Sequence, residues 1–179
     1  MCGRYYVDDE TSREIEKIVR KLDQRLKIEH GQDIHPSESA VVFTKECREV
    51  AARQMQWGFP GFQGKGLLIN ARAEAILDKK TFRESVLHRR CVIPARHFYE
   101  WSKNKEKYTF QSPKQDATLF MAGCYQIYNG QNCFVILTTQ ANASVAPVHE
   151  RMPLLLERQE LEDWIMEDAA VEFILAKRP

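Results

Sequence analysis

Hydrophobic positions along the chain change their spacing once, at about residue 39. Before that point they recur at helical intervals, through Ile15, Ile18, Val19, Leu22 and Leu26. Thr11 and Glu14 have the spacing of a capping box, and Gly31 is a typical stop signal. We therefore expect one long amphipathic helix that begins near Thr11 and packs its apolar face against the rest of the protein.

After residue 39 the chain is composed of short segments with the pattern of strands. We expect strands at residues 40–44, 49–57, 90–101, 107–111, 118–128 and 133–139. Between the last two, Asn129-Gly130 indicates a two-residue type I′ turn. This turn would set Gln126 opposite Cys133, and would put Cys124 diagonal to Cys133 on the same face.

Helical patterns and one glycine-rich loop complete the predicted elements. Short helices are expected at residues 80–88, 142–146, 157–167 and 169–177. The last two would bury Leu161, Trp164, Ile165, Phe173 and Ile174. Residues 58–66, with a proline and three glycines apart from Gly58 itself, are expected to form a long loop of the kind that often contacts ligands.

The order of these elements predicts the fold class. Strands follow one another without regular alternation with helices, which favours an α+β fold over a doubly wound one. We expect a single domain over residues 1–179, with a strongly curved, mostly antiparallel β core and flanking helices.

Composition narrows the classes of function without choosing among them. The chain has 26 Lys and Arg against 25 Asp and Glu, so contact with nucleic acid would need a local basic surface. Residues that could supply it are Lys79, Lys80, Arg83, Arg89, Arg90 and Arg96. The cysteines lack CxxC or disulfide-framework spacing, and no apolar run suits a signal peptide or a membrane helix. We expect a cytoplasmic protein with reduced thiols and no membrane partner.

The second position of the chain carries the strongest candidate for chemistry. Removal of Met1 would leave Cys2 with a free α-amine beside its thiol. Their ordinary pKa values, about 7.7 to 8.0 and 8.5, leave both groups partly deprotonated near neutral pH. A small second residue also occurs in many proteins merely because it permits removal of Met1. Other residues must therefore decide whether Cys2 is a nucleophile.

Polar residues interrupt apolar or strand-like surroundings at Asn70, Glu100, His149 and Arg151. Burial of such groups is costly unless they are paired or used. Each has an ordinary explanation when taken alone, as a turn or cap, an outward-facing strand carboxylate or a hydrogen-bonded loop residue. Together with Cys2 they would supply a nucleophile, an orienting amide, an acid–base group and an electrophile stabiliser.

Sequence blocks that contain these residues run through nearly the whole chain. They are Met1-Cys2-Gly3-Arg4-Tyr5, Trp57-Gly58-Phe59-Pro60, Ile69-Asn70-Ala71-Arg72-Ala73-Glu74, Arg89-Arg90-Cys91-Val92-Ile93-Pro94-Ala95, Phe98-Tyr99-Glu100-Trp101, Leu137-Thr138-Thr139-Gln140-Ala141-Asn142 and His149-Glu150-Arg151-Met152-Pro153. In this order they resemble the SRAP family, the SOS response-associated peptidases. The resemblance implies a curved antiparallel β core with flanking helices, in agreement with the strand pattern.

The resemblance also implies an activity. A protein of this family would remove its own Met1 by peptidase-like chemistry and then join Cys2 covalently to abasic sites in single-stranded DNA, during the response to DNA damage. The reaction with DNA would be a single-turnover crosslink of lyase type, with no metal and no cofactor. We expect a cytoplasmic monomer that associates with the nucleoid when DNA is damaged.

Individual roles follow from the same resemblance. The α-amine of Cys2 would form a Schiff base with the aldehyde of the opened sugar, and the thiolate would close a thiazolidine ring. Asn70 would position the amine, Glu100 would transfer protons, and His149 would hydrogen-bond the opened sugar oxygen. A carboxyl beside Trp101 could have a raised pKa suited to that transfer.

Further residues are candidates for contact with DNA. Arg4 and Arg72 match family positions beside the site and suit phosphate binding, whereas Arg151 could bind phosphate or form an internal ion pair. Stacking on bases, or wedging between them, is possible for three residues, although a core position would explain Trp57 equally well. These three residues are Trp57, Phe59 and Pro60. The run Asp33-Ile34-His35-Pro36 departs from the Tyr-Asn that the family usually has upstream of this proline.

Other classes of protein remain possible on the sequence. Class II glutamine amidotransferases also begin Met-Cys-Gly, but they need glutamine-binding and Asn-Gly oxyanion motifs, and the Asn-Gly here lies at a predicted hairpin tip. A papain-like protease is suggested by Cys2, His149 and Asn70, which lack its flanking signature and its order. The alternative function is therefore an N-terminal-cysteine amidohydrolase or cysteine peptidase with a non-DNA substrate. The non-enzymatic alternative is a single-strand DNA-binding module in which Cys2 has no role.

A metal site is the remaining possibility. His88, Cys91 and His97 have suitable spacing but lack a convincing fourth ligand, so we expect none.

Overall fold

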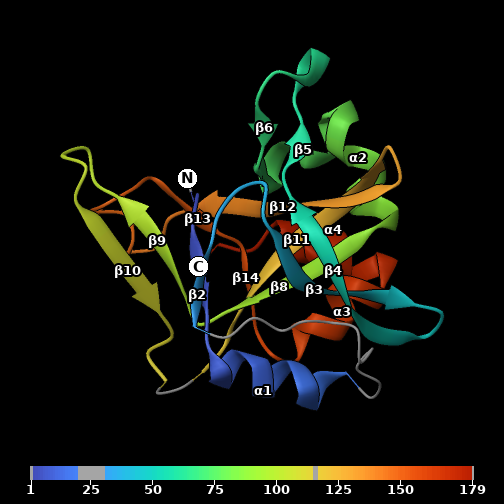
Figure 1. The fold of residues 1–179 in the computed structure, drawn as a ribbon, viewed down its shortest axis with the longest axis horizontal. Helices are drawn as coiled ribbons and strands as arrows, with labels where there is room; N and C mark the ends of the chain where they lie inside the picture. The colour runs from blue at the N-terminus through green and yellow to red at the C-terminus, as the bar shows by residue number, and fades with distance from the viewer. Residues whose placement is uncertain (1, 20–30, 115–116, 179) are drawn as a thin grey trace.

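Strands dominate the computed structural model, which describes residues 2–19, 31–114 and 117–178. A closed, barrel-like sheet forms the centre, a four-stranded sheet lies beside it, and short helices lie on the outside (Figure 1). The prediction of an α+β fold with a curved, mostly antiparallel core is confirmed. The strands of the barrel are β3 (Ser39–Glu46), β4 (Glu49–Trp57), β8 (Arg90–Ala95), β11 (Leu119–Tyr128) and β12 (Gln131–Gln140).

The barrel closes because its last strand pairs on both edges. The order is β12–β4–β3–β8–β11, and β11 pairs back onto β12. All of these pairs are antiparallel except β12 with β4. The short strands β7 (Asn70–Arg72), β13 (Arg151–Pro153) and β14 (Leu155–Leu156) extend the sheet, and β7 runs parallel to β12.

The predicted turn between β11 and β12 is present. Tyr128 lies opposite Gln131, and the intervening Asn129 and Gly130 have φ angles of 49° and 81°, as a type I′ turn requires. Gln126 therefore faces Cys133, as the turn predicts.

The second sheet brings the amino terminus against the barrel. Its order is β10 (Lys107–Gln111), β9 (His97–Trp101), β1 (Tyr5–Val7) and β2 (Gln32–Ile34). The single strand predicted at residues 90–101 is wrong, because β8 belongs to the barrel and β9 to this second sheet. At the break, the Arg96 N–H donates to the Tyr6 carbonyl at 2.8 Å instead of continuing the barrel ladder.

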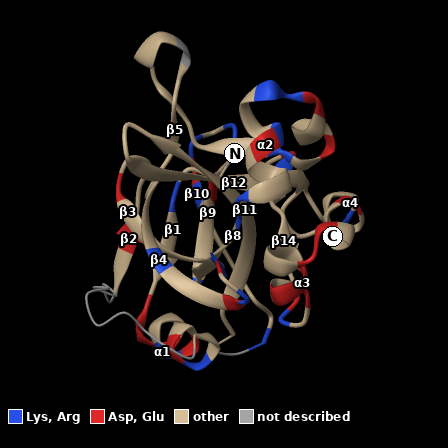
Figure 2. Ribbon diagram, turned by 90° about the vertical axis from the view of Figure 1, so that its right-hand side faces the viewer, with Lys and Arg blue, Asp and Glu red and all other residues tan. Residues whose placement is uncertain are grey.

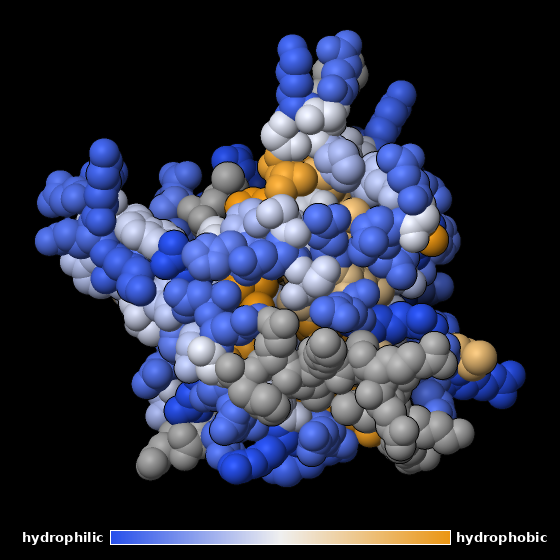
Figure 3. All heavy atoms as spheres, in the orientation of Figure 1, coloured by the Kyte–Doolittle hydropathy of each residue, from blue (hydrophilic) through white to orange (hydrophobic). Residues whose placement is uncertain are grey.

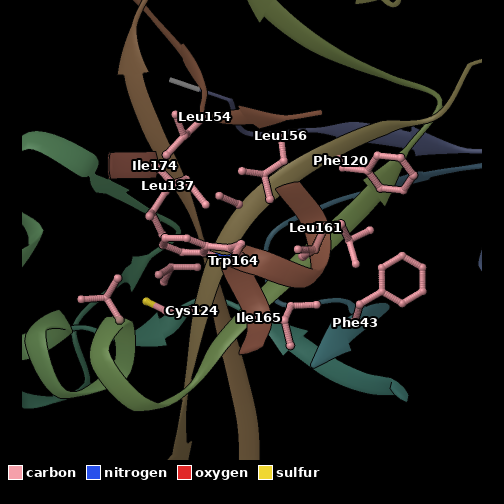
Figure 4. Close-up of a cluster of buried hydrophobic side chains, with 14 of the residues drawn as sticks. Phe43, Phe120, Cys124, Leu137, Leu154, Leu156, Leu161, Trp164, Ile165 and Ile174 are labelled. Carbon is pink, nitrogen blue, oxygen red and sulfur yellow. The ribbon is translucent and has the colours of Figure 1, made fainter. Parts of the chain in front are cut away.

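Alternating side chains on the barrel strands separate two apolar clusters. Along β12, Cys133, Val135 and Leu137 face the cluster that the helices cover, which also contains Trp164 (Figure 4). Phe134 and Ile136 face the other way, into a cluster inside the barrel. This interior cluster includes Cys2 and Tyr5, so the amino-terminal segment is part of the protein core.

The helix α1 (Asp9–Ile18) starts earlier than predicted. Its N-cap is Asp8, whose carboxylate accepts from the Thr11 N–H at 2.9 Å and from the Thr11 hydroxyl at 2.8 Å. Thr11 is thus the third residue of the helix and not its cap. Ile15 and Val19 are buried as predicted, and the continuation through Leu22 and Leu26 lies outside the described residues.

The carboxy-terminal helices are shorter than predicted. They are α3 (Glu160–Met166) and α4 (Val171–Leu175), joined by a 3₁₀ turn at Asp168–Ala170, whereas α2 (Lys80–His88) matches its prediction. Leu161, Trp164, Ile165 and Ile174 are buried as expected. The prediction for Phe173 is wrong: α4 turns Val171, Ile174 and Leu175 inward, which leaves Phe173 72% exposed.

Two loop predictions also need correction. Residues 142–146 form turns and no regular helix, although the Asn142 Oδ1 accepts from the N–H groups of Ser144 and Val145, both at 3.1 Å, as a helix cap does. Residues 58–66 are not an irregular loop throughout. β5 (Phe59–Pro60), a 3₁₀ turn at Phe62–Gly64 and β6 (Leu67–Leu68) form a hairpin that projects from the barrel (Figure 1). The 3₁₀ segment Ala73–Asp78 then leads into α2.

Candidate active site at the amino terminus

Cys2 lies at the meeting point of the barrel and the second sheet, and it is fully buried. The Asn70 side-chain amide donates to the Cys2 carbonyl at 2.9 Å. On the other side of the segment, the Tyr99 N–H donates to the Arg4 carbonyl at 3.0 Å. Two predicted site residues, far apart in sequence, are therefore in direct contact.

The position of Asn70 is set by the residue before it. The Ile69 carbonyl accepts from the Trp57 indole N–H at 3.0 Å and from the Ile136 N–H at 3.1 Å. Both donors belong to barrel strands, so β7 is fixed at two points just before Asn70. The Asn70 Oδ1 is buried and has no hydrogen-bond partner among the described residues. A buried acceptor of this kind is uncommon and suits an incoming donor.

The thiol of Cys2 is protonated in this state of the protein. Burial, together with the negative charge of Glu100, raises its pKa to about 12. Its Sγ is 3.6 Å from the Arg4 carbonyl oxygen, to which it donates. The expectation of a partly deprotonated thiol concerns the protein without Met1, and it stays a prediction for that form.

Glu100 is the buried carboxyl of the site, only 1% exposed on β9. Burial raises its pKa, and the positive charges of the amino terminus and of His149 partly oppose this. A raised pKa lets a carboxyl give or accept a proton closer to neutral pH. The electrostatic influence of Glu100 on the Cys2 thiol shows that the two groups share one environment.

His149 approaches the site from the segment between β12 and β13. Its N–H donates to the Val145 carbonyl at 3.0 Å, and its ring Nδ1 accepts from the Arg151 N–H at 3.0 Å. His149 lies with Trp101 and Tyr108 on the wall of an open cavity of about 800 Å³, between the β9–β10 hairpin and residues 146–150.

The predicted phosphate-binding residues differ in what they contact. Arg4 lies over the Trp101 ring at 5.4 Å and has a side chain that is 31% exposed. Arg72 is exposed and lines a smaller cavity of about 300 Å³. Arg151 lines the same cavity but forms the internal ion pair, with both its terminal nitrogens on the Glu74 carboxylate.

Arg151 is further fixed by the backbone. Its side chain is 10% exposed, and Nη2 donates to the Thr138 carbonyl at 2.7 Å. The Arg151 hydrogen bonds hold the pKa of Glu74 below its ordinary value. Of the two explanations for Arg151, the ion pair is the one that the structure contains.

Two of the three aromatic or apolar candidates for base stacking are buried. Trp57 packs against Tyr5 at 5.3 Å and Phe134 at 6.2 Å between ring centroids, and Phe59 packs against Tyr128 at 5.4 Å. Neither ring offers a face to a base in this conformation. Pro60, on the projecting hairpin, is exposed.

The expected basic surface is only partly present. Lys79, Lys80 and Arg83 are exposed around the start of α2, where Figure 2 shows basic and acidic segments mixed. The assignment of Arg90 to this surface is wrong, because its side chain is 3% exposed. The face in Figure 3 is mostly hydrophilic, with apolar side chains showing below the projecting hairpin.

Two absences concern the described residues alone. Within them, no group of three or more His, Cys, Asp or Glu is placed to hold a metal ion. None of the helices there is long and apolar enough to span a membrane.

Sequence analysis missed Asp33 as a support of the site and did not foresee how Trp57 contributes. Asp33 is 3.5 Å from Arg4 and accepts from the Tyr99 hydroxyl at 2.8 Å, and Trp57 acts through the strand of Asn70. The signal that could have indicated Asp33 is the departure of the run Asp33-Ile34-His35-Pro36 from the family pattern. No local pattern marks the contact of Trp57 with the Ile69 carbonyl, because it joins segments far apart in the chain.

Solved structures share this fold. A protein from Bacteroides thetaiotaomicron superposes with a TM-score of 0.81 at 21% identity, over 97% of this chain and 86% of that one. A phage-related protein from Bordetella bronchiseptica superposes with a TM-score of 0.77 at 21% identity, over 99% and 90%. These likenesses establish the fold.

The family follows from the sequence as a whole. The model of the SRAP family, SOS response associated peptidase, matches residues 1–177, and the chain belongs to this family. YoqW of Bacillus subtilis is 29% identical over 181 residues, which cover 92% of this chain and 80% of YoqW. YedK of Escherichia coli is 23% identical over 179 residues, covering 94% and 81%. Both relatives carry the name abasic site processing protein.

Proposed function

We propose that this protein processes abasic sites in single-stranded DNA by joining Cys2 to them covalently, once Met1 has been removed. Membership of the SRAP family and the names of its relatives support the substrate. The observation that carries the proposal is the contact between Asn70 and Cys2. The amide nitrogen of Asn70 binds the Cys2 carbonyl, while the buried Oδ1 has no partner in the described residues and is an acceptor for an α-amine.

The proposed reaction needs no oxidant and no reductant. The α-amine of Cys2 attacks the aldehyde carbon of the opened deoxyribose, and the resulting carbinolamine loses water to give an imine. The Cys2 sulfur then attacks the imine carbon while the imine nitrogen takes up a proton. The product is a five-membered thiazolidine, and the balance is one aldehyde and one aminothiol giving one ring and one water.

Glu100 is the proposed proton carrier of this sequence. A thiol with a pKa of about 12 must lose its proton as the sulfur attacks, and a nearby carboxylate can accept it. A carboxyl with a raised pKa can also protonate the hydroxyl that leaves as water. The raised pKa is what allows one group to serve in both directions.

His149 and the arginines are proposed to bind the rest of the lesion. An imidazole N–H of His149 is a donor of the kind that suits the opened sugar oxygen, and the open cavity that His149 lines gives DNA an approach. Arg4 and Arg72 are proposed to bind phosphates. Pro60 is the exposed candidate for contact with a base, whereas Arg151 and Trp57 support the site from within.

Removal of Met1 is the step that the family name describes. Removal is required because an α-amine that is blocked by Met1 cannot form a Schiff base. We propose that the removal is self-catalysed and occurs once. A monomer, and recruitment to the nucleoid after DNA damage, complete the proposal.

The experiment that tests it uses protein without Met1 and a single-stranded oligonucleotide with one abasic site. A one-to-one product that survives heat and detergent should form without reductant, metal or nucleotide. A strand whose abasic site has been reduced to the alcohol keeps the phosphates and bases but lacks the aldehyde, and should give none. Cys2→Ala keeps an α-amine and should give a product only after borohydride reduction. A stable product with the reduced strand, or none with the aldehyde, would reject the proposal.

A further inference from the structure

The segment in which the sequence departs from the family pattern places a carboxylate beside Arg4. Asp33 lies on β2, which pairs with β1, so it reaches the amino-terminal strand from the side. Its Oδ2 is 3.5 Å from the Arg4 Nη1, and the two side chains are 29% and 31% exposed. The pair is thus at the surface, above the buried Cys2.

Asp33 is held by a hydrogen-bonded chain of fixed direction. The Tyr99 hydroxyl donates its proton to the Asp33 Oδ1 at 2.8 Å, and the same hydroxyl is 2.8 Å from the His97 Nε2. Because that proton is used on Asp33, the His97 Nε2 must be the donor to Tyr99. His97 is in turn stacked on Tyr6, with ring centroids 4.8 Å apart. Side chains from two strands, β9 and β1, therefore fix the carboxylate.

The ion pair leaves much of the Arg4 guanidinium unused. Its single contact with Asp33, at 3.5 Å, is longer than the roughly 2.7 to 2.9 Å of a charge-assisted hydrogen bond. The guanidinium lies over Trp101, which orients it without consuming a donor. Asp33 therefore offsets the charge of Arg4 without occupying its donors, and any phosphate that binds Arg4 meets the negative charge of Asp33.

We propose that Asp33 is a built-in counter-charge that weakens the binding of Arg4 to undamaged single strands, so that capture depends on the covalent step at Cys2. This inference rests on the proposed function. Undamaged nucleotides greatly outnumber abasic ones, and a strong phosphate contact would hold the protein on the wrong sites. A fixed carboxylate lowers affinity for every strand equally, whereas the covalent step acts only where an aldehyde is present.

The sign of one substitution separates this role from a positioning role. If Asp33 only orients Arg4 for phosphate, its neutralisation weakens binding. If it is a counter-charge, Asp33→Asn tightens binding of a fluorescent oligothymidylate about three- to tenfold at low salt, with a gain that shrinks as salt rises. Asp33→Glu keeps the charge and should bind as the wild type does.

Matched controls address folding and global charge. Asp33→Ser is a second neutral variant and should tighten binding in the same direction. Asp163→Asn makes the same change in net charge on α3, on the helix-covered side, and should leave affinity within about twofold. In an Arg4→Ala background the gain from Asp33→Asn should be smaller, since the partner is absent. Unchanged or weaker binding in both neutral variants would overturn the inference.

The same samples are mixed with the abasic strand, so that two failures can be told apart. If the wild type forms the stable adduct but neither neutral variant binds oligothymidylate more tightly, the counter-charge is rejected and the proposed function stands. If the wild type forms no adduct but both neutral variants bind more tightly, the proposed function fails and Asp33 still controls affinity for DNA. Absence of both effects rejects both statements.

Discussion

Two buried charged side chains, Arg90 and Glu100, lie on consecutive strands and have opposite surroundings. Arg90, at the start of β8, donates from Nε to the Trp164 carbonyl at 2.6 Å and from Nη2 to the Asp168 carboxylate at 2.7 Å. Its Nη1 donates to carbonyls at the end of α2. Glu100, on β9, lies where burial disfavours its charge and raises its pKa.

Arg90 is a buried charge that the fold pairs with fixed acceptors, whereas Glu100 is a buried carboxyl whose charged form is disfavoured. The partners of Arg90 join β8 to two helices, so this charge holds the helix-covered side together. At Glu100 the cost of burial outweighs the neighbouring positive charges, and proteins keep carboxyls of this kind mainly at functional sites. Glu74 is of the first kind, since its partner Arg151 lowers its pKa.

The largest expected effect comes from Glu100→Gln. Loss of a general acid–base group should slow formation of the adduct by about 10²- to 10⁴-fold. Because the folded-state pKa of Glu100 is raised, the wild type loses stability as pH rises through that pKa, and the variant does not. The variant should therefore melt at a higher temperature than the wild type, with a gap that grows from the ordinary pKa of a glutamate up to the raised pKa of Glu100 and is constant above it.

Single-turnover rates and thermal melts across a pH series measure both effects of Glu100→Gln. Glu162→Gln, on α3, is the matched control and should change neither. A variant that reacts at the wild-type rate would remove Glu100 from the mechanism.

The next effect falls on the fold alone. Arg90→Met should lower the free energy of unfolding by about 3 to 5 kcal/mol, because it leaves the buried carbonyls and Asp168 without their partner. Arg83→Met, at an exposed position of the adjoining helix, should cost less than about 0.5 kcal/mol. Urea unfolding measures both. If Arg90→Met is as stable as Arg83→Met, the statement that the buried charge of Arg90 supports the fold is wrong.

A smaller effect tests how the fold supports the site. Trp57→Phe keeps a ring but removes the indole donor to the Ile69 carbonyl, so β7 and Asn70 should become less well fixed. A lost hydrogen bond of this kind costs roughly 0.5 to 1.5 kcal/mol. The adduct should form about three- to tenfold more slowly at saturating DNA, in keeping with an energy of that size. Affinity for undamaged DNA should stay the same, and a loss of affinity without a loss of rate would instead favour base stacking by this residue.

The smallest effect is expected at the carboxy-terminal helix. Phe173→Ser should change the free energy of unfolding by less than about 0.5 kcal/mol, because the ring is 72% exposed. Ile174→Ala, one position along α4 and 1% exposed, should cost about 2 to 5 kcal/mol. Equal costs for the two variants would contradict the observed orientation of the helix.

What the sequence predicts well is set by neighbours in the chain. The turn at Asn129-Gly130 determines the pairing of β11 with β12, and the helix at residues 80–88 has its predicted limits. The break between β8 and β9 could not be predicted, because it depends on a hydrogen bond between Arg96 and Tyr6. The exposure of Phe173 could not be predicted either, because it depends on the packing of α4 against residues distant in the chain.

The candidate site divides in the same way. Sequence blocks predicted Cys2, Asn70, Glu100 and His149 as site residues, and the structure gives the first two a direct hydrogen bond. Burial separates the remaining candidates, since Trp57 and Arg151 are buried while Arg4 and Arg72 reach the surface. Such distinctions depend on long-range packing, which no local pattern encodes.

The mass of the amino-terminal peptide from the adduct tests the central claim most directly. Protein and an abasic strand are incubated without reductant, digested with protease and nuclease, and analysed by mass spectrometry. The account predicts a peptide that begins at Cys2, lacks Met1 and carries the sugar remnant with the loss of one water, with no free thiol at Cys2. A remnant on any other residue, or on a peptide that still carries Met1, would contradict it.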